Sequence, residues 1–146
     1  MHRKAADAQS KDARAKLSEY GLKLTPQRTA IYDLIRDSKE HPTVDQIYKR
    51  IRKQLPNISF DTVYRTMLKF SEVGLVNMTE RYGENMRFDP RVDQHHHFHC
   101  IKCLKIIDFC DKGYDSIRVP KKLGRQFRII SKRVVLEGIC SGCGGK

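Results

Sequence analysis

The sequence predicts an α+β protein with a helical first half and a strand-rich second half. Up to Gly74, apolar residues recur at the spacing of amphipathic helices. Beyond residue 90 the pattern changes to the two-residue alternation of strands, and histidines and cysteines become frequent. A length of 146 residues allows one domain or two small ones. We expect an N-terminal domain over residues 1–88, a polar hinge over 89–94 and a C-terminal domain over 95–146.

The composition favours a polyanionic partner such as nucleic acid. The formal net charge is +12, and the sequence pI is about 9.7. Residues 1–90 carry 17 basic and 12 acidic residues, and residues 91–146 carry 12 and 5, so the first half alone does not hold the charge. No apolar run is long enough to cross a membrane, and the N-terminus lacks the apolar core of a signal peptide. We therefore expect a cytoplasmic protein with reduced cysteines.

The first two predicted helices are marked by their ends. A polar helix over residues 1–20 has one apolar stripe and stops at Gly21, a residue suited to a C-terminal cap. Thr25 and Pro26 are a capping hydroxyl followed by proline at the first helical position, so they predict the next helix. The stripes that we expect to be buried are Ala13, Leu17 and Tyr20, then Ile31, Leu34 and Ile35.

Two further helices and a hairpin complete the first half. The segment from Thr43 to Gln46 has the capping-box pattern, and Ser59 is positioned to cap a helix ending at Glu72. Residues 75–80 and 86–88 then alternate as two strands around a turn at 82–85. The three helices from Pro26 onward and the hairpin indicate a winged helix-turn-helix, whose last helix enters the DNA major groove. The alternative is a small helical bundle with a hairpin that binds nothing.

Four strands and one interrupted helix are predicted in the second half. The helix covers Asp115–Leu123 and is broken by Pro120. A domain of about 50 residues buries too little apolar surface to be stable alone, so we expect a metal, a dimer partner or both. The strands are His95–Cys100, Leu104–Phe109, Phe127–Ser131 and Arg133–Ile139.

Two Cys-x-x-Cys pairs, Cys100 with Cys103 and Cys140 with Cys143, indicate zinc. Zinc takes four tetrahedral nitrogen or sulfur ligands, and four thiolates leave no open position, so we predict a structural site. Because 36 residues separate the pairs, other structure must lie between them. Cys110 stands outside the pattern and is predicted to be an ordinary core residue.

Four histidines within five residues indicate a second metal site. On a strand, alternation places His95, His97 and His99 on one face and His96 on the other. We expect His95 and His97 to bind one metal, and His96 and His99 to bind none. Three imidazoles and two carboxylates suit iron(II) or manganese(II), with zinc also possible. The candidate partners from other segments are His41, Asp89 and Asp108.

Five stretches together resemble the ferric uptake regulator (Fur) superfamily, and the likeness runs from about Leu17 to Cys143. The resemblance implies a homodimeric winged-helix repressor with a C-terminal α/β dimerisation domain. It further implies that the repressor binds double-stranded operator DNA when a regulatory metal is loaded. The stretches are Gly21–Arg28, His41–Tyr48, Thr62–Arg65, Arg87–Asp89 and His95–Cys103.

Within this family the chain is most similar to the peroxide-sensing branch. Iron-responsive members usually carry glutamates at the positions of Asp89 and Asp108, and their further metal site is dismantled here. The resemblance implies that peroxide oxidises His41 or His95, which releases the metal and lifts repression. The implied regulatory ligands are His41, Asp89, His95, His97 and Asp108, and the positions of the dismantled site are Gln94, His96, Asp115 and Lys132.

Four residues are our candidates for DNA contacts. Tyr64 and Arg65 are expected at base edges or methyl groups, with Lys23 and Lys69 near phosphate or the minor groove. Peroxide sensors often have asparagine at the position of Arg65. Iron regulators have arginine there, as this chain does. An iron-responsive repressor without peroxide sensing is therefore the alternative.

Two rival functions belong to other classes. A zinc enzyme would need an open histidine site, a substrate pocket and a general base, and Glu137 is the one acid near the second cysteine pair. A metal-storage protein would bind metal without sequence-specific DNA affinity. We predict a repressor rather than an enzyme.

Overall fold

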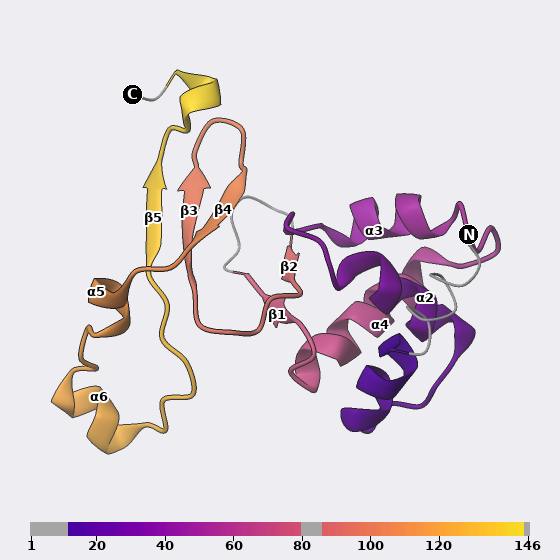
Figure 1. The fold of residues 1–146 in the computed structure, drawn as a ribbon, viewed down its shortest axis with the longest axis horizontal. Helices are drawn as coiled ribbons and strands as arrows, with labels where there is room; N and C mark the ends of the chain where they lie inside the picture. Colours follow the sequence, from indigo (N-terminus) through magenta and orange to yellow (C-terminus); the bar gives the residue numbers. More distant parts are fainter. Residues whose placement is uncertain (1–11, 80–85, 145–146) are drawn as a thin grey trace. The chain divides into compact units, whose positions relative to one another are not determined.

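The computed structural model describes residues 12–79 and 86–144. It divides the chain into two compact units, which we call the N-terminal unit, residues 1–92, and the C-terminal unit, residues 93–146. Mixed helices and short strands confirm the predicted fold class (Figure 1). Within the described ranges, no helix is both long and apolar enough to cross a membrane. The predicted turn at 82–85 lies outside the described residues.

The helices of the N-terminal unit begin where the capping signals predict. Of the helix predicted over residues 1–20, residues 12–19 are helical, and residues 1–11 lie outside the described ranges. Thr25 caps α2 (Pro26–Ile35) by accepting the N–H of Arg28, and Ser59 caps α4 (Phe60–Glu72) by accepting the N–H of Thr62. A complete capping box starts α3 (Val44–Ile51): the Thr43 hydroxyl accepts from the Gln46 N–H, and the Gln46 side chain accepts from the Thr43 N–H.

One apolar core holds these helices together. Its residues come from every described helix of the unit, from the segments next to them and from Phe88, and the largest of them are fully buried. Burying a side chain of this size contributes about 1.5–3 kcal/mol each, so this core is the main stabilising feature of the unit. The largest members are Leu17, Ile31, Ile35, Ile47, Ile51, Met67, Phe70 and Phe88.

The predicted hairpin is present in shortened form. Strand β1 (Asn77–Met78) pairs antiparallel with β2 (Phe88–Asp89), with Asn77 opposite Asp89. Residues 75 and 76 were predicted to be part of the first strand, but both side chains are buried and belong to the apolar core. An isolated bridge between Thr43 and Arg87 also connects β2 to the start of α3.

The C-terminal unit is a three-stranded sheet with the order β4-β3-β5. The central strand β3 (His96–Cys100) is antiparallel to β4 (Ile106–Phe109) and parallel to β5 (Val135–Gly138). Between β4 and β5 lie two short helices, α5 (Lys112–Asp115) and α6 (Lys121–Gln126) (Figure 1). The 3-10 turn η1 (Ser141–Cys143) follows β5.

Three expectations for this unit are wrong. Residues 127–131 form no strand, because they pair with neither outer edge of the sheet, whose order is β4-β3-β5. The helix expected over Asp115–Leu123 is interrupted at Pro120 as predicted, but its bounds are wrong: α5 already ends at Asp115, and Pro120 stands at the N-cap of α6. Cys110 is exposed rather than buried, because it follows the last residue of β4 and lies outside the sheet.

The capping box gives a first prediction. Changing Thr43 to alanine removes an acceptor for the Gln46 N–H, so we expect the free energy of unfolding to fall by about 1 kcal/mol. Urea unfolding followed by circular dichroism measures it. The control is Ser18→Ala at an exposed position of the first helix, where higher helix propensity makes the change neutral or slightly stabilising. Equal stabilities of the two variants would contradict the role of the box.

Candidate metal centres and nucleic-acid interface

The four cysteines of the two pairs meet at one end of the C-terminal sheet. Cys100 ends β3, and the parallel neighbour β5 leads into η1, so adjacent strands bring the pairs together. All four sulfur atoms lie within 4.8 Å of one another, and the Sγ atoms of Cys103 and Cys140 are 3.8 Å apart. Tetrahedral zinc with bonds of about 2.3 Å requires sulfur atoms about 3.8 Å apart. The residues therefore fit a four-thiolate zinc site.

Backbone groups prepare one of these thiols for metal binding. N–H groups of Cys103 and Cys140 point at the Cys100 sulfur and lower the pKa of this thiol to about 6. Hydrogen bonds with the side chains of Cys103 and Cys140 raise the pKa of Cys143 to about 12. One thiolate is thus stabilised before a metal arrives, and a divalent cation would favour ionisation of the rest.

A second group of donors forms on the same strand, nearer its start. In the antiparallel register His97 stands directly opposite Asp108 of β4. The Nε2 atoms of His95 and His97 are 3.0 Å apart, and the Oδ1 atom of Asp108 lies 3.9 Å and 3.5 Å from them. Ligands about 2.1 Å from one metal lie roughly 3.0–3.5 Å apart, so this spacing is close to that of a coordination shell. Both imidazoles are fully buried.

The His95 ring is held in its orientation by a backbone carbonyl on the side away from His97. Its Nδ1 atom lies 2.7 Å from the carbonyl oxygen of Asp93, a group that only accepts hydrogen bonds. Nδ1 therefore carries the proton in the neutral ring, and Nε2 keeps its lone pair toward His97. A backbone carbonyl behind a histidine is the usual support of a metal ligand. Our sequence reasoning missed Asp93, because every residue has a backbone carbonyl and the residue type does not show which one will contact a histidine.

The N-terminal unit holds two more candidate ligands, His41 and Asp89. The bridge between Thr43 and Arg87, with a bond from the Phe88 N–H to the Pro42 carbonyl, aligns the two segments. His41 Nε2 lies 3.8 Å from Asp89 Oδ2, and both side chains are almost fully buried. A buried carboxylate needs compensating positive charge, so this pair is suited to a cation.

Two contacts hold this pair in place, and our sequence reasoning assigned neither. The Arg87 guanidinium donates to the His41 carbonyl at 3.0 Å, and the Arg91 N–H donates to Asp89 Oδ1 at 2.8 Å. The second bond occupies one carboxylate oxygen and turns the other toward His41. The stretch from Arg87 to Asp89 was noted as a motif, but only the fold shows that its arginine reaches back to residue 41.

His96 points to the other face of β3, where protein groups use both of its ring nitrogens. Nδ1 accepts from the Val134 N–H, and Nε2 lies 3.1 Å from Asp115 Oδ1. Lys132 donates to the carbonyls of Asp115 and Ile117, and Gln94 donates to the Lys132 carbonyl. Protein groups thus occupy both nitrogens of His96, and Lys132 holds the backbone around Asp115 in place.

The predicted DNA-contacting residues lie on the N-terminal unit. Tyr64 and Arg65 are exposed on α4, and Lys69 of the same helix pairs with Glu72 at 3.0 Å. A cavity of about 420 Å³ lies between the start of α2 and the first half of α4, and Lys23 and Arg65 are among its lining residues. Their role in DNA binding stays a prediction.

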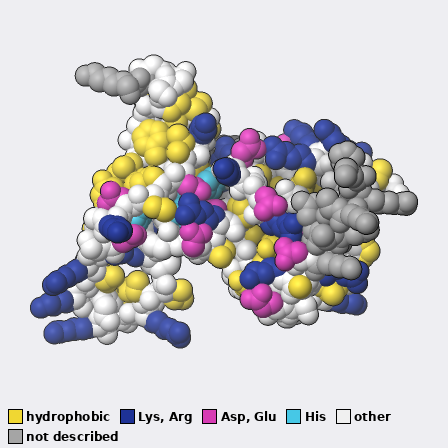
Figure 2. Space-filling view, in the orientation of Figure 1, with side chains coloured by type: hydrophobic (Ala, Val, Ile, Leu, Met, Phe, Trp, Pro, Cys, Tyr) yellow, Lys and Arg dark blue, Asp and Glu magenta, His cyan; other side chains and the backbone are white. Residues whose placement is uncertain are grey.

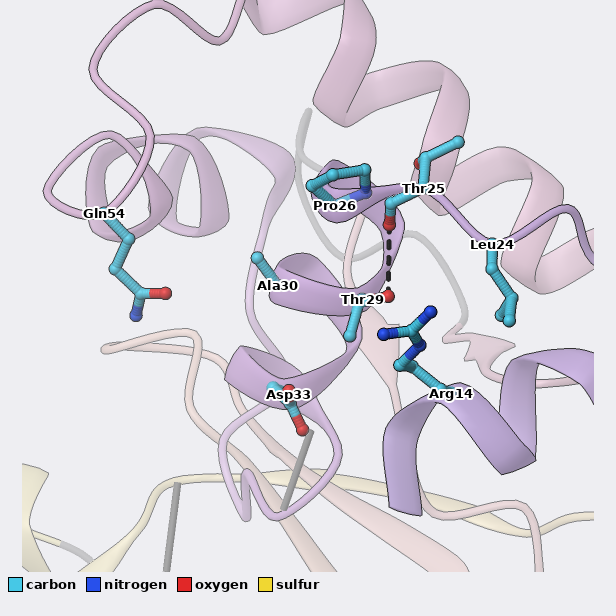
Figure 3. Close-up of a pocket in the computed structure, with 8 residues that line it drawn as sticks. All are labelled: Arg14, Leu24, Thr25, Pro26, Thr29, Ala30, Asp33 and Gln54. Carbon is cyan, nitrogen blue, oxygen red and sulfur yellow. Dashed lines mark hydrogen bonds between the residues drawn. The ribbon is translucent and has the colours of Figure 1, made fainter. Parts of the chain in front are cut away.

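A second cavity, of about 400 Å³, shows no convergent chemistry. Figure 3 shows its lining, including Thr29, whose hydroxyl donates to the Thr25 carbonyl at 3.1 Å within α2. None of the predicted metal-binding or DNA-contacting residues lines it. The labelled residues are Arg14, Leu24, Thr25, Pro26, Thr29, Ala30, Asp33 and Gln54.

Comparison with known proteins agrees with this architecture. The model of the ferric uptake regulator family matches residues 19–137. The peroxide operon regulator of Bacillus subtilis is 36% identical over 136 residues, which cover 93% of this chain and 94% of that protein. The chain belongs to the ferric uptake regulator family.

Solved structures of similar proteins share the fold. The Helicobacter pylori ferric uptake regulator superposes with a TM-score of 0.72 at 22% identity, over 96% of this chain and 94% of that one. The peroxide-sensing regulator PerR of Streptococcus pyogenes gives a TM-score of 0.50 at 27% identity, with 92% of each chain covered. This family member therefore has the two-part fold of these regulators.

The cysteine cluster gives a second prediction. At pH 7.5 the Cys100 thiol, with its pKa lowered to about 6, is already ionised, so zinc added to the metal-free protein should release fewer than four protons. At pH 5, below that pKa, protonated Cys100 raises the number released. Calorimetry in buffers of different ionisation enthalpy measures the count, and Cys110→Ser is the matched control. A count that does not rise between these pH values would contradict the lowered pKa.

Proposed function

We propose that the protein is a metal-dependent, DNA-binding transcriptional repressor that senses peroxide. One observation carries the proposal: β3 ends in a four-thiolate group and carries, on one face, a separate group made only of nitrogen and oxygen donors. The closed four-thiolate site suits a structural zinc ion, and the open site of nitrogen and oxygen donors on the same strand suits a regulatory ion. One relative is named peroxide operon regulator and another peroxide-responsive repressor, and both names support this function.

The regulatory site is proposed to take ligands from both units. His95, His97 and Asp108 supply one side, and His41 and Asp89 supply the other. Three imidazoles and two carboxylates without thiolate favour iron(II) or manganese(II). A shared ion would bind more tightly to the arrangement of units that completes its shell, and so would favour that arrangement.

The proposed partner is double-stranded operator DNA, bound by a homodimer. Tyr64 and Arg65 lie on α4, in the position of a recognition helix, and Lys23 is in the adjoining segment. For the dimer, the support is the apolar surface of the C-terminal unit: Ile107, Leu136 and Ile130 are 40%, 39% and 90% exposed, and Figure 2 shows hydrophobic side chains on this unit. Surfaces of this kind mark association sites.

The group that peroxide oxidises is proposed to be a histidine imidazole. Iron(II), when bound, supplies the redox chemistry toward peroxide. The net change is the gain of one oxygen atom by His41 or His95 and the release of one water molecule from hydrogen peroxide. An oxidised ring is a poorer ligand, so the ion leaves and the DNA-competent arrangement is no longer favoured.

An iron-responsive repressor without peroxide sensing is the second candidate. Arg65 favours it, because the resemblance links arginine at this position to iron regulators. The carboxylates favour peroxide sensing, since Asp89 and Asp108 stand where iron regulators usually have glutamate. Relatives named as regulators, rather than enzymes or storage proteins, support both candidates over the rivals, and a regulator of genes is expected in the cytoplasm.

A third prediction tests metal-dependent DNA binding. The zinc-containing protein should select a motif from a randomised 30-base-pair duplex library with Mn²⁺ present, and bind it about tenfold or more weakly without Mn²⁺. Fluorescence anisotropy measures the affinity. Asp108→Asn should remove the Mn²⁺ effect, whereas Asp111→Asn, which keeps a competent cap of α5, should retain it. Affinity that does not change with Mn²⁺ would sink the mechanism.

A fourth prediction concerns the oxidised residue. Hydrogen peroxide should add one oxygen atom to His41 or His95 in the iron(II)-loaded protein, as measured by peptide mass spectrometry. Protein loaded with Zn²⁺ at the regulatory site is the control, because zinc has no redox chemistry. Oxidation confined to cysteines would show that histidine is not the sensor and would leave the iron-responsive alternative.

A further inference from the structure

An acidic residue lies among the basic residues of the cavity between α2 and α4. Asp61 of α4 lines the cavity of about 420 Å³ together with Lys23, Arg28 and Arg65. Its Oδ2 atom is 2.8 Å from Nε of Arg65, one helical turn further on. The two side chains are 66% and 78% exposed. Such a pair on a helix surface contributes little to stability. Asp61 also stands in the first turn of α4, where a carboxylate interacts favourably with the helix dipole, but that interaction is independent of the basic residues that line the cavity.

The pair constrains the guanidinium that we propose to contact bases. Bonding through Nε leaves the two terminal nitrogens of Arg65 for another partner, and arginine recognises guanine through paired donors to O6 and N7. A side chain already held by a carboxylate loses less rotameric freedom when it binds. The carboxylate therefore favours a defined base contact over the many geometries by which a free arginine reaches phosphate.

The negative charge of Asp61 also weakens binding to DNA that lacks the correct sequence. Phosphate contacts supply most of the sequence-independent affinity of a DNA-binding protein. A carboxylate within this basic cavity repels phosphates in every register, whereas the contact between Arg65 and guanine offsets that repulsion only at the correct site. Specificity is such a difference between affinities, and an unfavourable element can create it.

We infer that Asp61 is a specificity-determining residue: it orients Arg65 toward a G·C base pair and weakens binding to other DNA. The inference rests on the proposed DNA-binding function. It gives Asp61 a role in DNA recognition, although an acidic residue is not expected on a basic DNA-binding surface. Asp61 is a positioning residue, because it acts through Arg65.

The experiment compares motifs selected by Mn²⁺-loaded full-length protein from the randomised duplex library. Wild-type protein should enrich one G·C base pair per half-site that Arg65→Ala no longer selects. Asp61→Asn should lose about fivefold or more of the preference for that pair over A·T, and should bind scrambled duplex about threefold more tightly. Adding Asp61→Asn to Arg65→Ala should cause no further loss at that pair.

Two variants separate charge from orientation. Asp45→Asn is the matched control: Asp45 pairs with Lys49 of α3 at 2.7 Å with the same four-residue spacing, and its removal changes the net charge equally. It should leave the selected motif intact. Asp61→Glu keeps the charge but lengthens the side chain, so scrambled duplex should bind as in wild type while the G·C preference falls.

The outcomes distinguish this inference from the proposed function. If wild-type protein selects no motif, repressor function itself is wrong. If wild type selects a motif and Asp61→Asn gives the same motif with the same affinity for scrambled duplex, the role of Asp61 is overturned. A motif change that also appears in Asp45→Asn would reduce the effect to net charge and would overturn it as well.

Discussion

The register of β3 is the constraint on which the C-terminal unit depends. Because β3 is the central strand, its partners decide what each of its residues meets. β4 places Asp108 opposite His97, and β5, whose Gly138 pairs with Cys100, leads into the second cysteine pair. Side chains alternate between faces, so a shift by one residue would turn His95 and His97 away from Asp108. That shift would turn His96 toward Asp108 instead. Both candidate metal groups therefore require the same register.

The two units bury different chemistry. Aliphatic and aromatic side chains fill the N-terminal core, whereas the largest fully buried side chains of the C-terminal unit are His95, His96, His97 and His99. Buried imidazoles need partners, and β3 answers this differently on its two faces. On one face Asp115 and the Val134 N–H occupy His96. On the other, His95 and His97 direct nitrogen donors at a carboxylate, an arrangement that a divalent cation would stabilise.

Local signals allowed sequence reasoning to predict much of this. Caps at Thr25, Thr43 and Ser59 act within four residues, so the helix starts were predictable, and Cys-x-x-Cys spacing encodes a zinc knuckle directly. Non-local pairing was harder. Residues 127–131 have strand-like composition, but a strand forms only where the segment pairs with another strand, and composition does not reveal that pairing. The backbone contacts behind His95 and Asp89 escaped prediction for the same reason.

The opposite ends of β3 suit different lifetimes of metal binding. A four-thiolate site satisfies zinc completely and admits no further ligand, so an ion held there resists exchange. The imidazole and carboxylate donors bind a harder ion with weaker bonds, and part of the proposed ligand set belongs to the other unit. Cys100 lies only three residues from His97 along a rigid strand. Zinc at one end would therefore hold the strand in register while the regulatory ion at the other end binds and dissociates. The protein could then lose its regulatory metal and remain folded.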